Sequence, residues 1–95
     1  MSEWIELFRV QLKGREEFKA TGFTRHYANG GLLPEPVALS IVQCNNNRGH
    51  TGFYLFYLDE TGEEQTDTYH DDLDGAFRQA ELEFCVQKSD WTKID

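Results

Sequence analysis

Residues 52–84, GFYLFYLDETGEEQTDTYHDDLDGAFRQAELEF, change their hydrophobic pattern along their length. Residues 52–58 are apolar or aromatic at nearly every position, which is typical of a short strand buried on both faces. Residues 59–62 carry turn chemistry, and residues 64–69 return as a more polar strand that is rich in Thr. The sequence therefore predicts a β-hairpin over residues 52–69.

From Asp72 onward the apolar residues recur at the spacing of an α-helix. One helical face collects Leu73, Ala76, Phe77, Ala80 and Phe84. We expect Phe77, Ala80 and Phe84 to be almost completely buried against the aromatic strand, and Asp71 or Asp72 to cap the helix. Because glycine weakens a helix, we also expect another backbone to approach Gly75 closely. The tail at residues 89–92 predicts a turn or short helix that docks Trp91.

Outside this stretch, the patterns predict further strands. Residues 5–13 alternate between apolar and polar positions, and residues 37–44 are apolar at nearly every position, which fits a strand buried on both faces. Residues 16–20 and 23–27 are weakly patterned and indicate a strand interrupted by a bulge or turn. The Gly and Pro residues of segment 28–36 indicate a loop.

These elements predict one α+β domain over residues 1–95, in which an antiparallel sheet of four to five strands packs against one C-terminal amphipathic helix. A single helix can cover only one face of the sheet. The other face must be closed by the N-terminal segment, by Trp4 and Trp91, by the 28–36 loop, or by a second molecule. A homodimer is therefore one open alternative.

Composition limits the class of protein. No run of about 18 or more apolar residues occurs, and the N-terminus lacks the basic start and apolar run of a secretory signal. We expect a cytoplasmic protein that is not inserted in a membrane. Cys44 and Cys85 lie in apolar segments without Cys-x-x-Cys or zinc spacing, which predicts two buried, reduced thiols.

The net charge of −8 is concentrated in one region. Residues 59–83 hold ten acidic residues and one base, Arg78, whereas the flanking segments are close to neutral. Such a field repels nucleic acid and anionic membranes, and it speeds encounter with a basic protein. The sequence thus favours a protein partner of basic character, with an acidic surface that only maintains solubility as the alternative.

Four parts of the sequence form a recognisable set: Gly52-Phe53-Tyr54-Leu55-Phe56-Tyr57, Thr66-Asp67-Thr68-Tyr69-His70, Ala80-Glu81-Leu82-Glu83-Phe84 and Trp91, with Gly22-Phe23-Thr24-Arg25 as a further candidate. This set resembles a group of small uncharacterised bacterial proteins, some of them similar to immunity proteins of toxin systems. The similarity to immunity proteins is one of size and acidity, and it favours a protein-binding role. The resemblance implies no activity, cofactor or catalytic residue.

The candidate binding residues are acidic side chains and one histidine near the predicted hairpin turn and the junction between strand and helix. They are Glu63, Glu64, Asp67, His70, Asp71 and Asp74. We interpret them first as part of a protein-binding (immunity-like or regulatory) surface. Because carboxylates and a histidine also suit a divalent cation or acid-base catalysis, an enzyme centred on Asp67, His70 and Asp71 is the alternative. That alternative requires these side chains to converge; with no catalytic motif in the sequence, we predict no catalytic residue, metal ligand or cofactor.

Overall fold

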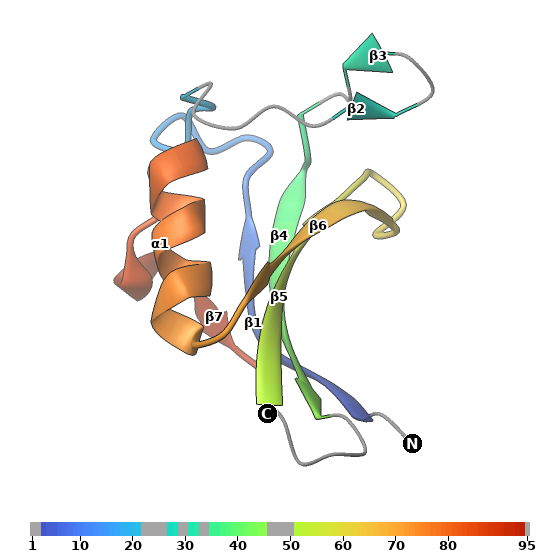
Figure 1. Cartoon of the computed structure of the whole chain (residues 1–95). Coiled ribbons are helices and arrows are strands. Elements are labelled where there is room, and N and C mark those ends of the chain that lie inside the picture. The colour runs from blue at the N-terminus through green and yellow to red at the C-terminus, as the bar shows by residue number, and fades with distance from the viewer. Residues whose placement is uncertain (1–2, 22–26, 29–30, 33–34, 46–50, 95) are drawn as a thin grey trace.

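The computed structural model describes residues 3–21, 27–28, 31–32, 35–45 and 51–94. Within these residues, a twisted antiparallel sheet carries one α-helix on one of its faces (Figure 1). The α+β fold predicted from the sequence is therefore confirmed. No helix in the described segments is long and apolar enough to cross a membrane.

The sheet has five strands in the order β6-β5-β4-β1-β7. They are β1 (Glu3–Gln11), β4 (Ala38–Asn45), β5 (Thr51–Leu58), β6 (Glu64–His70) and β7 (Thr92–Lys93). The predicted hairpin is formed by β5 and β6, and the two most apolar strands, β4 and β5, lie side by side in the sheet. Strand β6 forms one edge of the sheet.

Helix α1 (Leu73–Phe84) begins where the sequence predicts it, because the Asp72 side chain accepts a hydrogen bond of 2.7 Å from the Gly75 amide. Ala76, Ala80 and Phe84 are buried against the sheet, whereas Phe77 is only half-buried. Phe84 contacts Tyr57 of β5, with 6.2 Å between the ring centroids. The predicted helical phase is thus correct, although the burial of Phe77 is less complete than expected.

The core lies between α1 and the face of the sheet that we call the inner face. Residues that pair across neighbouring strands point to the same side of a sheet, so the register identifies this face. Val10 pairs with Leu39, and Ile41 pairs with both Phe8 and Leu55. The short helix η1 (Lys88–Asp90) then delivers Trp91 into the same core, as predicted.

Two predictions for the N-terminal half are wrong. Residues 16–20 form no strand, because hydrogen bonds from Arg15 to the Leu12 carbonyl and from Phe18 to the Arg15 carbonyl fold this segment into turns. The predicted 28–36 loop contributes to a separate ladder between β2 (Tyr27–Ala28) and β3 (Gly31–Leu32). Residues 22–26, which hold most of the second predicted strand segment, lie outside the described residues.

Three further details differ from expectation. At Gly75 the close neighbours are side chains and not another backbone, since an added Cβ would come within 3.1 Å of Asp72 Oδ1 and 3.2 Å of His70 Cβ. Cys44 is half-buried and Cys85 is exposed, because Cys85 caps the helix with a left-handed backbone (φ 63°); both thiols are free. Trp91 packs on the inner face against Phe77 and does not help to close the opposite face.

Candidate functional site

Aromatic side chains cover the face of the sheet opposite α1, which we call the outer face. Tyr54 and Tyr69 are directly paired across β5 and β6, and Phe56 lies two residues further along β5 on the same side. Trp4 of β1 pairs with Cys44 of β4, which places it on this face as well. These four residues, Trp4, Tyr54, Phe56 and Tyr69, form the aromatic patch.

The rings of the aromatic patch contact one another in a continuous row. The Trp4 ring centroid lies 5.2 Å from that of Tyr54 and 6.0 Å from that of Phe56. Tyr54 and Tyr69 meet edge to face at 5.1 Å. Since Trp4 belongs to β1 and its two neighbours belong to β5, its indole must extend across the intervening strand β4. The patch therefore spans four strands, from β1 to β6.

The two ends of this row remain largely open to solvent. Trp4 is 54% exposed and Tyr69 is 52% exposed. The Tyr69 ring lies directly over Gly52, where an added Cβ would come within 2.3 Å of it. Gly52 therefore provides the space that the exposed Tyr69 ring occupies, because any larger residue would push the ring away.

Acidic residues border the patch along β6. Asp67 is paired directly with Phe56, whereas Glu64 is paired with Leu58, one position beyond the pair of Tyr57 and Thr66. Between these two pairs, β5 advances by one residue and β6 advances by two. The additional residue, Gln65, forms a β-bulge. In a regular strand, residues three apart would point to opposite faces; the bulge brings Glu64 to the same face as Asp67.

The carboxyl groups of Glu64 and Asp67 interact directly. A hydrogen bond to Asp67 raises the pKa of Glu64 to about 7, and partial burial and the Asp67 charge act in the same direction. Two carboxylates this close do not readily ionise together. None of the ion pairs formed within the described residues involves either carboxylate.

The opposite border of the outer face is electrically balanced. Glu6 of β1 accepts hydrogen bonds of 2.7 Å from Arg9 Nε and 2.6 Å from Ser40 Oγ. Burial would raise the pKa of Glu6, but these hydrogen bonds and the Arg9 charge outweigh it, so that the pKa is lowered. The uncompensated negative charge of this face therefore lies on the β6 side.

The structure separates the candidate binding residues of the sequence into different environments. Glu63 lies in the turn before β6, and Glu64 and Asp67 lie beside the aromatic patch. His70 pairs with Phe53, which packs against the core, so it lies on the inner face. Asp71 follows β6, and Asp74 in the first turn of α1 forms an ion pair of 2.9 Å with Lys88.

Asp67 and His70 therefore point to opposite sides of β6 and do not converge. Thr68 hydrogen-bonds to His70 Nε2 at 2.8 Å, and burial lowers the pKa of the imidazole despite the nearby carboxylates. No group of three or more His, Cys, Asp or Glu residues in the described part of the chain could hold a metal ion. The convergence that the enzyme alternative requires is not found.

Sequence reasoning missed a buried acidic residue in the core. Glu83 is only 2% exposed, and its carboxylate accepts hydrogen bonds from the Tyr57 hydroxyl and, at 2.9 Å, from Gln79 Nε2. Burial and the Glu83 carboxylate together raise the pKa of the Tyr57 phenol. The signal was present in the sequence, since Glu83 follows Ala76 by seven positions and Ala80 by three, on the buried helical face.

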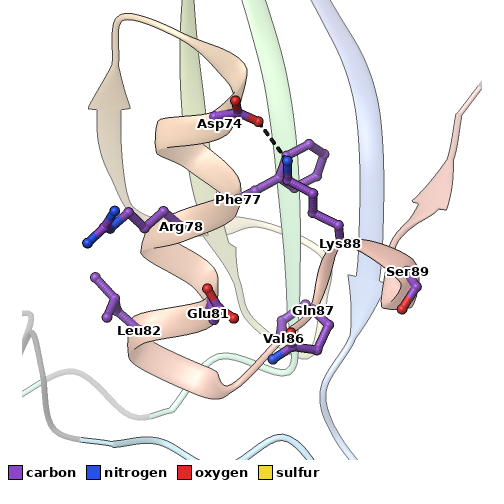
Figure 2. A pocket seen from close by; sticks show the side chains of 9 residues that line it. All are labelled: Asp74, Phe77, Arg78, Glu81, Leu82, Val86, Gln87, Lys88 and Ser89. Atoms are coloured by element: carbon purple, nitrogen blue, oxygen red, sulfur yellow. Dashed lines mark hydrogen bonds and ion pairs between the residues drawn. The ribbon is translucent and has the colours of Figure 1, made fainter.

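A groove of about 660 Å³ lies between α1 and the segment at residues 86–89 (Figure 2). Lys88 and Asp74 form their ion pair across it, and Lys88 Nζ lies 5.7 Å from the centroid of the Phe77 ring. Arg78 and Leu82 point away from Lys88 in this view. Lys88 and Asp74 neutralise each other across the groove, and Arg78 and Glu81 are the other charged side chains that line it.

Comparison with protein-family models, with curated proteins and with solved structures found no match for the chain.

Proposed function

We propose that the chain is a protein-binding module and that the outer face of its sheet is the contact surface. One observation carries the proposal: Trp4 and Tyr69, at the ends of a row of touching rings, are 54% and 52% exposed. Trp and Tyr are the side chains that contribute most binding energy in protein interfaces, because they bury a large area with little loss of conformational freedom.

The arrangement of the outer face supports a protein partner over a small ligand. The patch is formed by a sheet surface and not by a concave cavity, whereas small-molecule sites are usually enclosed. Its rings lie at the centre and charged residues, Glu6, Arg9, Glu64 and Asp67, lie around them. An apolar centre with a polar rim is the usual anatomy of a protein interface.

The acidic region of the sequence thus contributes only in part to this surface. Asp59 accepts backbone hydrogen bonds within the turn, Asp72 caps α1, Glu60 and Asp74 form ion pairs, and Glu83 is buried. Glu64 and Asp67 remain beside the patch. The immunity-like or regulatory role suggested by the sequence, in the cytoplasm, is compatible with a module that masks part of another protein.

The test is an affinity capture from the native cell with the full chain immobilised. We expect a specific protein to be retained by the unmodified chain and lost from the Trp4→Ala, Tyr69→Ala double variant. The Arg78→Ala, Glu81→Ala variant, which changes exposed positions on α1, is the matched control and should retain it. Equal retention by all three chains would contradict the proposal, and so would a loss confined to the α1 variant.

The gene neighbourhood gives an independent check on the immunity-like role. A toxin-like reading frame beside the gene in several genomes would support that role, and the captured protein should then be its product. A captured protein encoded elsewhere would favour a regulatory role.

A further inference from the structure

The outer face has two chemically different parts that touch each other. The aromatic patch is apolar and electron-rich on its ring faces, and the carboxylates of Glu64 and Asp67 lie at its β6 border. We propose that this face binds a basic protein segment whose arginine side chains pack on the rings and pair with Glu64 and Asp67. The inference rests on the proposed function and names its partner.

The distances between strands bring the two parts within reach of one guanidinium group. Asp67 is directly opposite Phe56, and such pairs have Cβ atoms about 5 Å apart. Phe56 in turn stacks on both Tyr54 and Trp4, at centroid distances of 5.9 and 6.0 Å. A guanidinium group can stack on an aromatic ring and donate two parallel hydrogen bonds to a carboxylate at the same time, which an ammonium group cannot do.

The charge balance of the outer face identifies the sign of its partner. Glu6 is neutralised by Arg9 at 2.7 Å, while Glu64 and Asp67 take part in no ion pair formed by the described residues. Their carboxyls also repel each other when both are ionised. A cation of the partner would pair with these carboxylates and would also relieve the repulsion between them. Both effects strengthen the binding of a positive charge at this border.

The same charges argue against a second copy of the chain as the occupant. A two-fold dimer through the outer face would bring together two identical patches and two identical acidic borders, on chains that each carry a net charge of −8. Arg9, a cation that the described residues place on this face, is already paired with Glu6. Like charges placed opposite each other destabilise a complex, so the charges of this face disfavour a homodimer.

The test uses the full chain and defined peptides. An arginine–glycine peptide is titrated into the ¹⁵N-labelled protein, and its lysine–glycine and glutamine–glycine counterparts serve as matched probes. The two indole N–H signals report separately on the exposed Trp4 and the buried Trp91, and Trp4→Phe assigns them. We expect the arginine peptide to shift the Trp4 signal in a saturable, salt-sensitive way and to leave Trp91 unchanged, with the lysine peptide binding severalfold more weakly.

Charge variants make the inference specific to this border. Glu64→Gln with Asp67→Asn should weaken arginine-peptide binding about tenfold. The control, Glu16→Gln with Glu81→Gln, removes two negative charges from exposed positions outside the sheet and should leave it nearly unchanged. The arginine assignment would be overturned if both double variants weakened arginine-peptide binding equally, or if the Trp4 signal did not respond. It would also be overturned if the glutamine peptide or the lysine peptide bound as tightly as the arginine peptide.

The failure of this inference is distinguishable from the failure of the proposed function. Suppose that a captured native partner is lost from the Trp4→Ala variant, but that its binding does not change with salt or in the Glu64 and Asp67 variants. The partner would then not be basic, whereas the proposed binding function would still hold. A dimer of the unmodified chain in sedimentation, dissociated by Trp4→Ala, would also overturn the inference, in favour of a second copy.

Discussion

Tyr54 and Tyr57 lie three residues apart on β5, yet they have opposite surroundings. Tyr57 is 1% exposed, packs against Phe84 of α1 and donates its hydroxyl hydrogen to Glu83. Tyr54 lies half-buried on the outer face, between Trp4 and Tyr69. The same residue type thus holds the helix on one face of the sheet, and forms an open surface on the other. Aromatic content alone does not distinguish a core from a contact surface.

The largest expected effect comes from the inner face. Phe84→Ala should lower the free energy of unfolding by about 3 to 5 kcal/mol, because it removes transfer energy and leaves a cavity between α1 and β5. Trp4→Ala, although it removes a larger side chain, should cost only about 1 kcal/mol, since the indole is more than half exposed. Chemical denaturation measures both, and comparable losses would contradict the contrast between the faces.

The next effect concerns the buried pair of Tyr57 and Glu83. Tyr57→Phe keeps the ring and removes the hydroxyl that donates to the Glu83 carboxylate. Because this buried acceptor then has one donor fewer, the free energy of unfolding should fall by about 1 to 3 kcal/mol. The matched control is Tyr54→Phe on the outer face, which should cost less than about 0.5 kcal/mol. If Glu83→Gln, added to Tyr57→Phe, restores most of the lost stability, the loss came from the hydrogen bond that the Glu83 carboxylate no longer accepts.

The Asp72 cap of α1 is expected to contribute about 1 kcal/mol to the free energy of unfolding. Asp72→Ala removes the side-chain acceptor of the Gly75 amide, whereas Asp71→Ala changes a neighbouring charge and leaves the cap intact. The two variants alter net charge equally. An unfolding free energy that falls by the same amount in both would attribute the effect to electrostatics and not to the cap.

The smallest effect is a pH dependence on the outer face. Because the pKa of Glu64 is raised to about 7 in the folded chain and is about 4.5 when exposed, the folded state binds more protons between these values. This contribution to stability is present below about pH 4.5 and is lost as the pH rises through about 7. We expect Glu64→Gln to remove this slope. A slope unchanged by Glu64→Gln would mean that another group is responsible.

The elements with strong periodicity could be predicted from sequence, and those that depend on distant contacts could not. The phase of α1, its Asp72 cap and the central pair of β4 and β5 follow from local patterns. The bare aromatic face was also foreseeable, since one helix covers one face. The alignment of Trp4 with Tyr54 and Phe56 depends on a register across β4, which no local pattern specifies.

The candidate site shows the same limit. Asp67 and His70 are three positions apart in a regular part of β6, where the alternation of a strand sends them to opposite faces, as the register has them. Glu64 and Asp67, in contrast, share a face only because Gln65 forms a bulge, and a bulge in one strand is defined by the residues of its partner. Sequence position placed ten acidic residues in one region but could not tell which of them would cap, pair, become buried or remain beside the patch.

The outer face, and not the helix side, is the surface that we propose to contact the partner. The most direct measurement is the map of amide and indole chemical-shift changes when the captured partner is added to the ¹⁵N-labelled full chain. We expect the changes to cluster at Trp4, Tyr54, Asp67 and Tyr69. Changes confined to the groove side, at Asp74, Glu81 and Lys88, would contradict this expectation.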